Sequence, residues 1–182
     1  MDRRRRYFGY AAVALLIGLT IPGVASAERI HATLSGYEEV PAASTPASGE
    51  FRAMISPDDE SIDYELTFTD LVGTVQQSHI HMGQMSVNGS IVIWLCQTAT
   101  TPAPAAVAAL TPFCPAPGGT VTGNITVANV IAAGTASQQI AAGELAEVVA
   151  AIRAGVAYVN VHATPLNPGG EVRGQIRASS ER

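Results

Sequence analysis

The chain has 182 residues, about the length of one domain, with 10 basic residues (none of them lysine) against 15 acidic ones. Without the first 27 residues, six arginines would face 14 acidic side chains, a formal charge of −8. Because an acidic surface repels phosphate groups, this composition excludes nucleic acids and anionic lipids as expected partners.

The first 27 residues have the pattern of an export signal. Four arginines in a row precede an uncharged apolar run over residues 7–24, and the small-residue triplet Ala-Ser-Ala follows directly. An apolar run of about 18 residues is also long enough for a membrane anchor, but the cleavage triplet favours removal. We therefore predict a signal peptide over residues 1–27. The mature domain, residues 28–182, is expected to be periplasmic or secreted and to have no stable membrane anchor.

Apolar and polar residues alternate through most of the mature part, which predicts β-strands. The clearest case is residues 61–68, where Ile, Tyr, Leu and Phe alternate with Asp, Glu and Thr. A Pro-Asp-Asp turn signal joins this strand to the one before it, residues 49–55, as a hairpin. Further strands are predicted over residues 30–34, 78–82, 90–95, 119–127, 157–162 and 171–177.

One segment departs from this alternation. Residues 144–153 carry apolar side chains at helical spacing, and Gly155 follows as a C-terminal cap, so we predict a short helix that crosses one end of the sheet structure. Seven or eight short strands with turn signals between them predict an all-β fold. We expect an antiparallel Greek-key sandwich or barrel with one short helix.

Cys96 and Cys114 are the only cysteines. In an exported chain such a pair predicts a disulfide, which would close the proline-rich segment 97–113 into a loop. In the chain-entropy description, closing a loop of this size stabilises the fold by about 3 kcal/mol. The alternatives are two free thiols or a metal site, although the spacing matches zinc-ligand motifs poorly.

Four segments together resemble the CHRD domain family, first described in chordin. They are residues 34–41 (LSGYEEVP), 78–89 (SHIHMG followed by NG), 154–162 (AGVAYVNVH) and 168–175 (PGGEVRGQ), and they follow the order of the family. The resemblance implies an immunoglobulin-like β-barrel, through the limited similarity of the family to copper/zinc superoxide dismutases. It implies no particular biochemical activity, because the antagonism of growth factors by chordin does not transfer to a single exported domain.

Three of the four histidines lie in these segments: His79, His81 and His162. Side chains two residues apart on a strand leave the same face, so His79 and His81 can share one ion. If the strand that ends at His162 is their neighbour, the three imidazoles form a copper or zinc site with one coordination position open. His31, on the first strand, could be a fourth ligand. The alternative is a hydrogen-bonded histidine group without metal.

Other polar residues of these segments have supporting roles in this interpretation. Asn160 or Glu171 could orient the ring of a metal-binding histidine without binding the ion itself. Glu171 and Arg173, two apart on one strand, are predicted to form an ion pair within the sheet rather than an anion site. The pair Glu38-Glu39 falls in a predicted loop, where acidic side chains are expected to be solvated.

The sequence supports two functional hypotheses. In the first, the protein is an exported, non-catalytic binding or structural module whose loops contact an extracytoplasmic protein or ligand of unknown identity. In the second, it binds copper or zinc through the three histidines. An enzyme is not expected, because the chain has no Gly-x-Ser-x-Gly motif and four histidines are too few for a two-metal superoxide dismutase site.

Overall fold

The computed structural model describes residues 26–179, so the predicted signal peptide, apart from its last two residues, lies outside the described residues. The described part contains nine strands, one α-helix and short 3₁₀-turns. The strands are β1 (Glu28–Ser35), β2 (Ser48–Ile55), β3 (Ile62–Thr69), β4 (Thr74–Met82), β5 (Ser90–Cys96), β6 (Gly119–Ile125), β7 (Ala157–Thr164), β8 (Asn167–Gln175) and β9 (Arg177–Ala178), and the helix is α1 (Leu145–Arg153). Within residues 26–179, no helix has the length and apolar character needed to cross a membrane.

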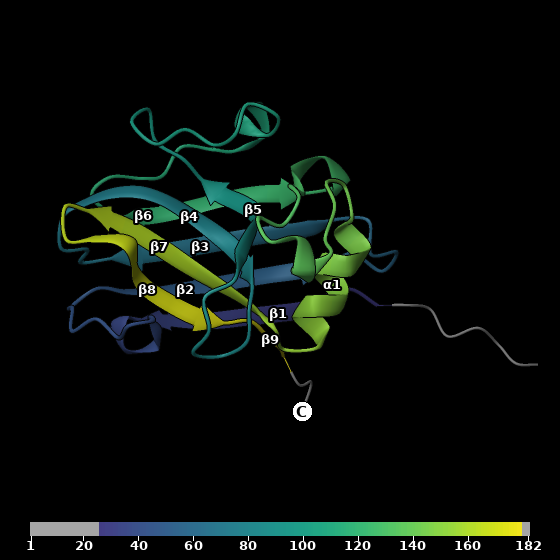
Figure 1. Ribbon diagram of the computed structural model, residues 1–182, viewed down its shortest axis with the longest axis horizontal. Helices are drawn as coiled ribbons and strands as arrows, with labels where there is room; N and C mark the ends of the chain where they lie inside the picture. Colours follow the sequence, from purple (N-terminus) through teal and green to yellow (C-terminus); the bar gives the residue numbers. More distant parts are fainter. Residues whose placement is uncertain (1–25, 180–182) are drawn as a thin grey trace, which may run out of the picture.

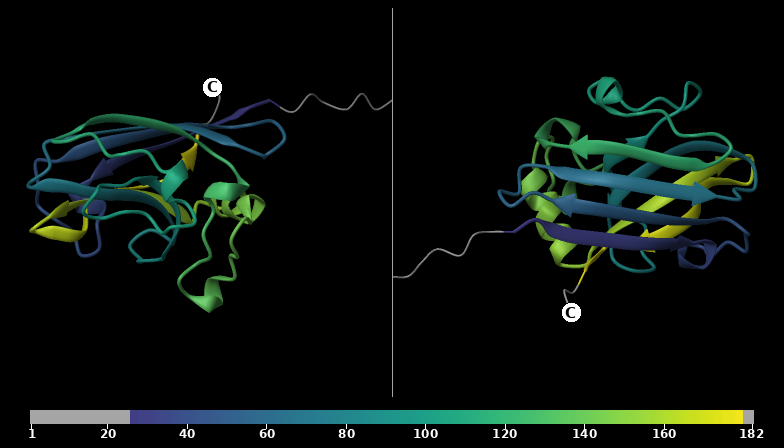
Figure 2. Two further views of the ribbon diagram at one scale, coloured as in Figure 1. Left: turned by 90° about the horizontal axis from the view of Figure 1, so that it is seen from above. Right: turned by 180° about the vertical axis from the view of Figure 1, so that it is seen from behind.

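All the strands belong to one antiparallel sheet with the order β5-β4-β7-β8-β1-β2-β3-β6, and β9 pairs with β1. The sheet curls into two layers, β5-β4-β7-β8 and β1-β2-β3-β6 (Figures 1 and 2). A single residue pair, Ser35 with Arg173, joins β1 to β8 where the sheet bends from one layer into the other. Gly174 allows this close approach, because a Cβ at that position would clash with the carbonyl oxygen of Thr33. The predicted all-β antiparallel fold is confirmed, as a nearly closed barrel with one short helix.

The apolar core lies between the two layers. The four apolar residues of β3 that the alternation places on one face are all buried there. The Tyr64 hydroxyl, on this face, donates a hydrogen bond to the carbonyl oxygen of Leu95 at 2.6 Å and so connects the layers. Helix α1 covers one end of the barrel (Figure 1). The opposite layer contributes Ile80, Val159, Val161 and Val172 to the same core.

Strand β5 stands at one end of the sheet order, and a neighbouring stretch of chain covers its outer edge. Ile93 forms an antiparallel bridge with Val130. The backbone N–H of Ile131 donates to the carbonyl oxygen of Val92 at 3.0 Å. The edge of β5 is therefore paired in its middle, where the two layers meet again.

The predicted disulfide between Cys96 and Cys114 is formed at the end of β5. It closes the loop of residues 97–113, which projects at the top of Figure 1. The buried amide of Gln97 holds this loop by donating to the carbonyl oxygens of Ala108 and Thr111 at 2.7 and 2.6 Å. Beneath the loop, Trp94 packs with Ala103 and Val107 in a small apolar cluster of its own.

Candidate metal centre

The polar residues predicted to carry chemistry meet on the outer face of the β4-β7-β8 layer, which faces the viewer in Figure 1. Strand β4 pairs with β7, so that His79 lies opposite Asn160 and Gln77 opposite His162. Strand β7 in turn pairs with β8, which places Asn160 opposite Arg173. Because side chains alternate along a strand, the residues between these positions point into the barrel core.

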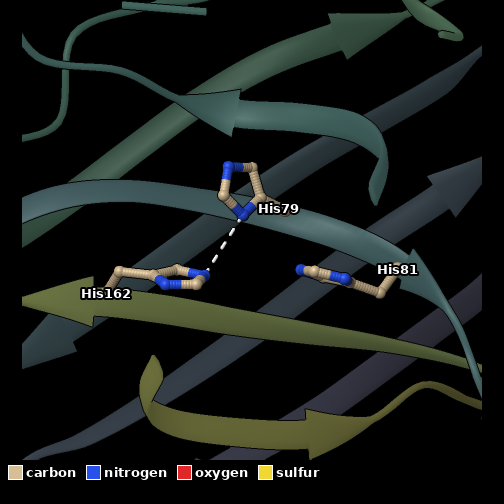
Figure 3. Close-up of side chains that lie close together, drawn as sticks. All are labelled: His79, His81 and His162. Carbon is tan, nitrogen blue, oxygen red and sulfur yellow. Dashed lines mark hydrogen bonds between the residues drawn. The ribbon is translucent and has the colours of Figure 1, made fainter. Parts of the chain in front are cut away.

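His79, His81 and His162 form a cluster that is 0%, 7% and 6% exposed, respectively. One nitrogen of each ring lies within 4.8 Å of the other two, and Figure 3 shows these nitrogens facing a common space. The closest pair is His79 Nδ1 and His162 Nε2, at 3.2 Å. The condition set by the sequence, that the two histidine-bearing strands be neighbours, is therefore met.

Two backbone carbonyls fix which ring nitrogens face this space. His81 Nδ1 lies 2.9 Å from the carbonyl oxygen of Gly89, and His162 Nδ1 lies 2.9 Å from that of Pro168. A carbonyl oxygen only accepts, so both Nδ1 atoms carry the hydrogen and both Nε2 atoms carry a lone pair. Metal-binding histidines are commonly held in this way, through their second nitrogen.

Burial lowers the pKa of all three imidazoles and keeps them neutral near pH 7. The pKa of His81 falls to about 4, and that of His79 lies well below its usual range because of burial and of the neighbouring imidazoles. Burial also lowers the pKa of His162, against the opposing hydrogen bond to Pro168. Since metal ions bind the deprotonated imidazole, protons compete weakly for this cluster.

Arg173 supports the cluster from the side of His81. Its guanidinium carbon lies 3.4 Å from the centre of the Tyr158 ring, and the His81 ring stacks on Tyr158 with centroids 4.6 Å apart. The Tyr158 ring thus contacts both the Arg173 guanidinium and the neutral His81 imidazole. The guanidinium also donates to the backbone carbonyl oxygens of Gln84 and Val87, each at 3.0 Å. These contacts hold the loop after β4 in place.

The predicted ion pair between Glu171 and Arg173 is not formed in the described part of the chain. Glu171 instead accepts hydrogen bonds from Thr45 Oγ1 at 2.6 Å and from the backbone N–H of Val72 at 2.7 Å. Its second carboxylate oxygen is buried without a hydrogen-bond partner. Each of the two long side chains finds partners in a different loop, so they extend away from one another.

Sequence reasoning missed Glu39, which was expected to be solvated but is 7% exposed. The turn Gly36–Glu38 directs the chain over β8, where Gly170 leaves room for the carboxyl group, since a Cβ there would clash with Glu39 Oε1. Burial raises the pKa of this carboxyl to about 7. Its position in the family-like segment 34–41 was the one signal that could have identified it.

Two further residues complete the description of the cluster. Trp94, which the sequence did not single out, packs on His79 with ring centroids 4.3 Å apart. His31, considered as a fourth ligand, lies exposed on β1, where its Nδ1 is 3.2 Å from Ser179 Oγ. The metal-type cluster found among residues 26–179 consists of the other three histidines.

All four family-like segments contribute to this centre, although they are far apart in the sequence. The first brings Glu39, the second His79, His81 and the carbonyl of Gly89, the third Tyr158, Asn160 and His162, and the fourth the carbonyl of Pro168 and Arg173. The four segments that resemble the family thus meet at one place in the fold.

Comparison with protein families finds the family that these segments resemble. The model of the family described as CHRD domain matches residues 30–176, which includes the three histidines and nearly all of the described structure. No curated protein and no solved structure matches the chain.

Proposed function

The chain belongs to the CHRD domain family, and we propose that it binds one copper or zinc ion through His79, His81 and His162. The observation that carries this proposal is the convergence of three neutral, buried imidazoles on one space. His81 Nε2, which the contact of Nδ1 with Gly89 leaves with a lone pair, is buried without a hydrogen-bond partner. Buried polar atoms are nearly always paired, so an unpaired nitrogen in such a cluster favours an ion as its partner.

The spacing of the ring nitrogens fits one ion after a small contraction. With metal–nitrogen bonds of about 2.0 Å, two ligand nitrogens are about 3.3 Å apart in a tetrahedral site and about 4 Å apart at most. The 3.2 Å between His79 Nδ1 and His162 Nε2 already matches the tetrahedral value. The remaining separations are no larger than 4.8 Å, which a modest rotation of one side chain shortens sufficiently.

The ligand set favours copper or zinc over other common ions. Imidazole nitrogens suit these metals, whereas Mg²⁺ and Ca²⁺ prefer carboxylate and carbonyl oxygens. Both cysteines are joined in the disulfide, so no thiolate is available to the ion.

We also propose that the protein acts outside the cytoplasm as a binding protein rather than as an enzyme. The Cys96–Cys114 disulfide supports this location, since structural disulfides persist mainly in oxidising compartments. In that setting the domain would buffer, carry or sense the ion.

The test is the metal content of the purified protein, with its disulfide intact, after exposure to Cu²⁺ or Zn²⁺ and removal of unbound ions. We expect about one ion per chain in the wild type and none in the His79→Ala/His81→Ala double variant. His31→Ala is the matched control, because it removes the exposed histidine outside the cluster and should keep the ion. A wild-type protein that retains no ion would contradict the proposal.

A further inference from the structure

The side chain of Asn160 reaches into the histidine cluster. Asn160 lies opposite His79 on the neighbouring strand and is 3% exposed. Its Oδ1 atom is 3.0 Å from His162 Nε2, the same nitrogen that lies 3.2 Å from His79 Nδ1. Both distances are close to the edge of about 3.3 Å expected between two ligands in a tetrahedral site. Two pairs of atoms, which share His162 Nε2, therefore already stand at the spacing of neighbouring ligands around one ion.

The contact between Asn160 and His162 joins two acceptors. His162 Nδ1 carries the hydrogen, because it faces the carbonyl oxygen of Pro168, so its Nε2 presents a lone pair. An amide oxygen also presents lone pairs and has no hydrogen to donate. Two acceptors 3.0 Å apart are unfavourable unless a cation shares them, and a metal ion in this space would do so.

We propose that Asn160 Oδ1 is the fourth ligand of the ion, so that the centre is closed by three histidines and one asparagine. The inference rests on the proposed function, because it assigns a ligand to the same ion. Closed four-ligand sites hold a metal, whereas catalytic sites keep one position for water or substrate. Asn160 fills the coordination position that three histidines alone would leave open. The centre therefore belongs to the closed sites that hold an ion rather than to the catalytic ones.

The experiment uses Co²⁺ as a spectroscopic probe of the full exported protein and azide as an added ligand. We expect the visible absorption of the Co²⁺-loaded wild type to be intense, as for four-coordinate cobalt, and unchanged by azide. In Asn160→Ala, Co²⁺ should bind at least about tenfold more weakly, and azide should alter the spectrum by entering the vacated position.

Two further variants separate a ligand from a structural role. Asn160→Asp keeps an oxygen at the same place and should restore a spectrum that azide does not change. Gln175→Ala is the matched control, since Gln175 lies on the adjacent strand and donates to the carbonyl oxygens of Gly83 and Gly155 rather than to the cluster. It should behave as the wild type.

The outcomes distinguish this inference from the proposed function. A Co²⁺-loaded wild type whose spectrum shifts with azide has an open position and overturns the inference, while the metal site stands. An Asn160→Ala variant that binds Co²⁺ with wild-type affinity and ignores azide also overturns it. A wild type that binds no Co²⁺ overturns the metal site together with its fourth ligand.

Discussion

The two faces of strands β4 and β7 are equally buried but chemically opposite. Ile80 and Val159 point into the barrel and are fully buried among apolar side chains. Their neighbours His79, Asn160 and His162 point outward and are nearly as buried, yet all are polar. The inner face gains stability from the hydrophobic effect, whereas burying polar groups is unfavourable unless they find partners. The outer face therefore depends on partners for its polar groups, whereas the inner face depends on apolar contacts.

The two faces also differ in what covers them. The other layer of the sheet covers the inner face, while loops cover the outer one. Arg173 binds the loop after β4, Glu171 binds Thr45 and Val72, and His162 binds Pro168. Each loop is held by side chains of the outer face itself. The covering loops and the histidine cluster therefore depend on the same side chains. Substitutions can test them separately from the apolar core.

The largest effect is expected from the inner face. Ile80→Ala leaves a cavity in the core and should lower the free energy of unfolding by about 2–5 kcal/mol. Denaturant unfolding of the metal-free protein measures this loss. The ion content of the folded variant should stay at the wild-type value, because none of the proposed ligands is changed. Loss of the ion from a well-folded Ile80→Ala protein would show that the two faces are not independent.

A smaller effect is expected from the loop that covers the outer side of β5. Replacing both cysteines, Cys96→Ser/Cys114→Ser, should lower the free energy of unfolding by about 3 kcal/mol. Because residues 97–113 pack over Trp94, the only tryptophan, freeing the loop should expose it. Acrylamide quenching of its fluorescence should increase in the variant. Equal quenching in both proteins would mean that the loop stays in place without its disulfide.

The smallest of the three effects depends on pH. The folded-state pKa of Glu39 is about 7, above its ordinary value of 4.5, so the stability it contributes is present at low pH and is lost as the pH rises through 7. Relative to Glu39→Gln, the metal-free wild type should therefore gain about 2 kcal/mol between about pH 8 and about pH 5. Unfolding curves of both proteins at the two pH values give the difference.

The inner face supplies the control for this measurement. Ile80→Val changes no titratable group, so its difference from the wild type should be the same at both pH values. A difference between wild type and Glu39→Gln that is also independent of pH would mean that the carboxyl of Glu39 is not held in its buried position.

The comparison of the two faces also explains which parts of the fold and of the histidine cluster were predictable from the sequence. The alternation of β3 predicted its buried face correctly, because apolar periodicity records directly which side meets the core. The spacing of His79 and His81 predicted a shared face for the same reason. That His162 lies beside them was only a condition, since the pairing of β4 with β7 joins residues about 80 positions apart and contains a register shift.

The supporting residues were harder to predict, because their surroundings come from distant loops. Glu39 is buried by a turn and by the absence of a side chain at Gly170, and neither appears in local hydropathy. Arg173 was assigned the wrong partner because its stacking on Tyr158 depends on the register of two strands. Local patterns thus identify strands and candidate ligands, while the partners of buried polar groups require the three-dimensional arrangement.

The covered edge of β5 has a consequence for how separate molecules meet. A strand at the end of a sheet offers free N–H and C=O groups, on which another chain can add a strand and begin aggregation. In the middle of β5, the pairing of Ile93 with Val130 and the hydrogen bond from Ile131 to Val92 occupy such groups. A second copy would have to displace this segment before it could pair there. The stretch that pairs with β5 therefore also shields this edge from pairing with a second copy of the chain.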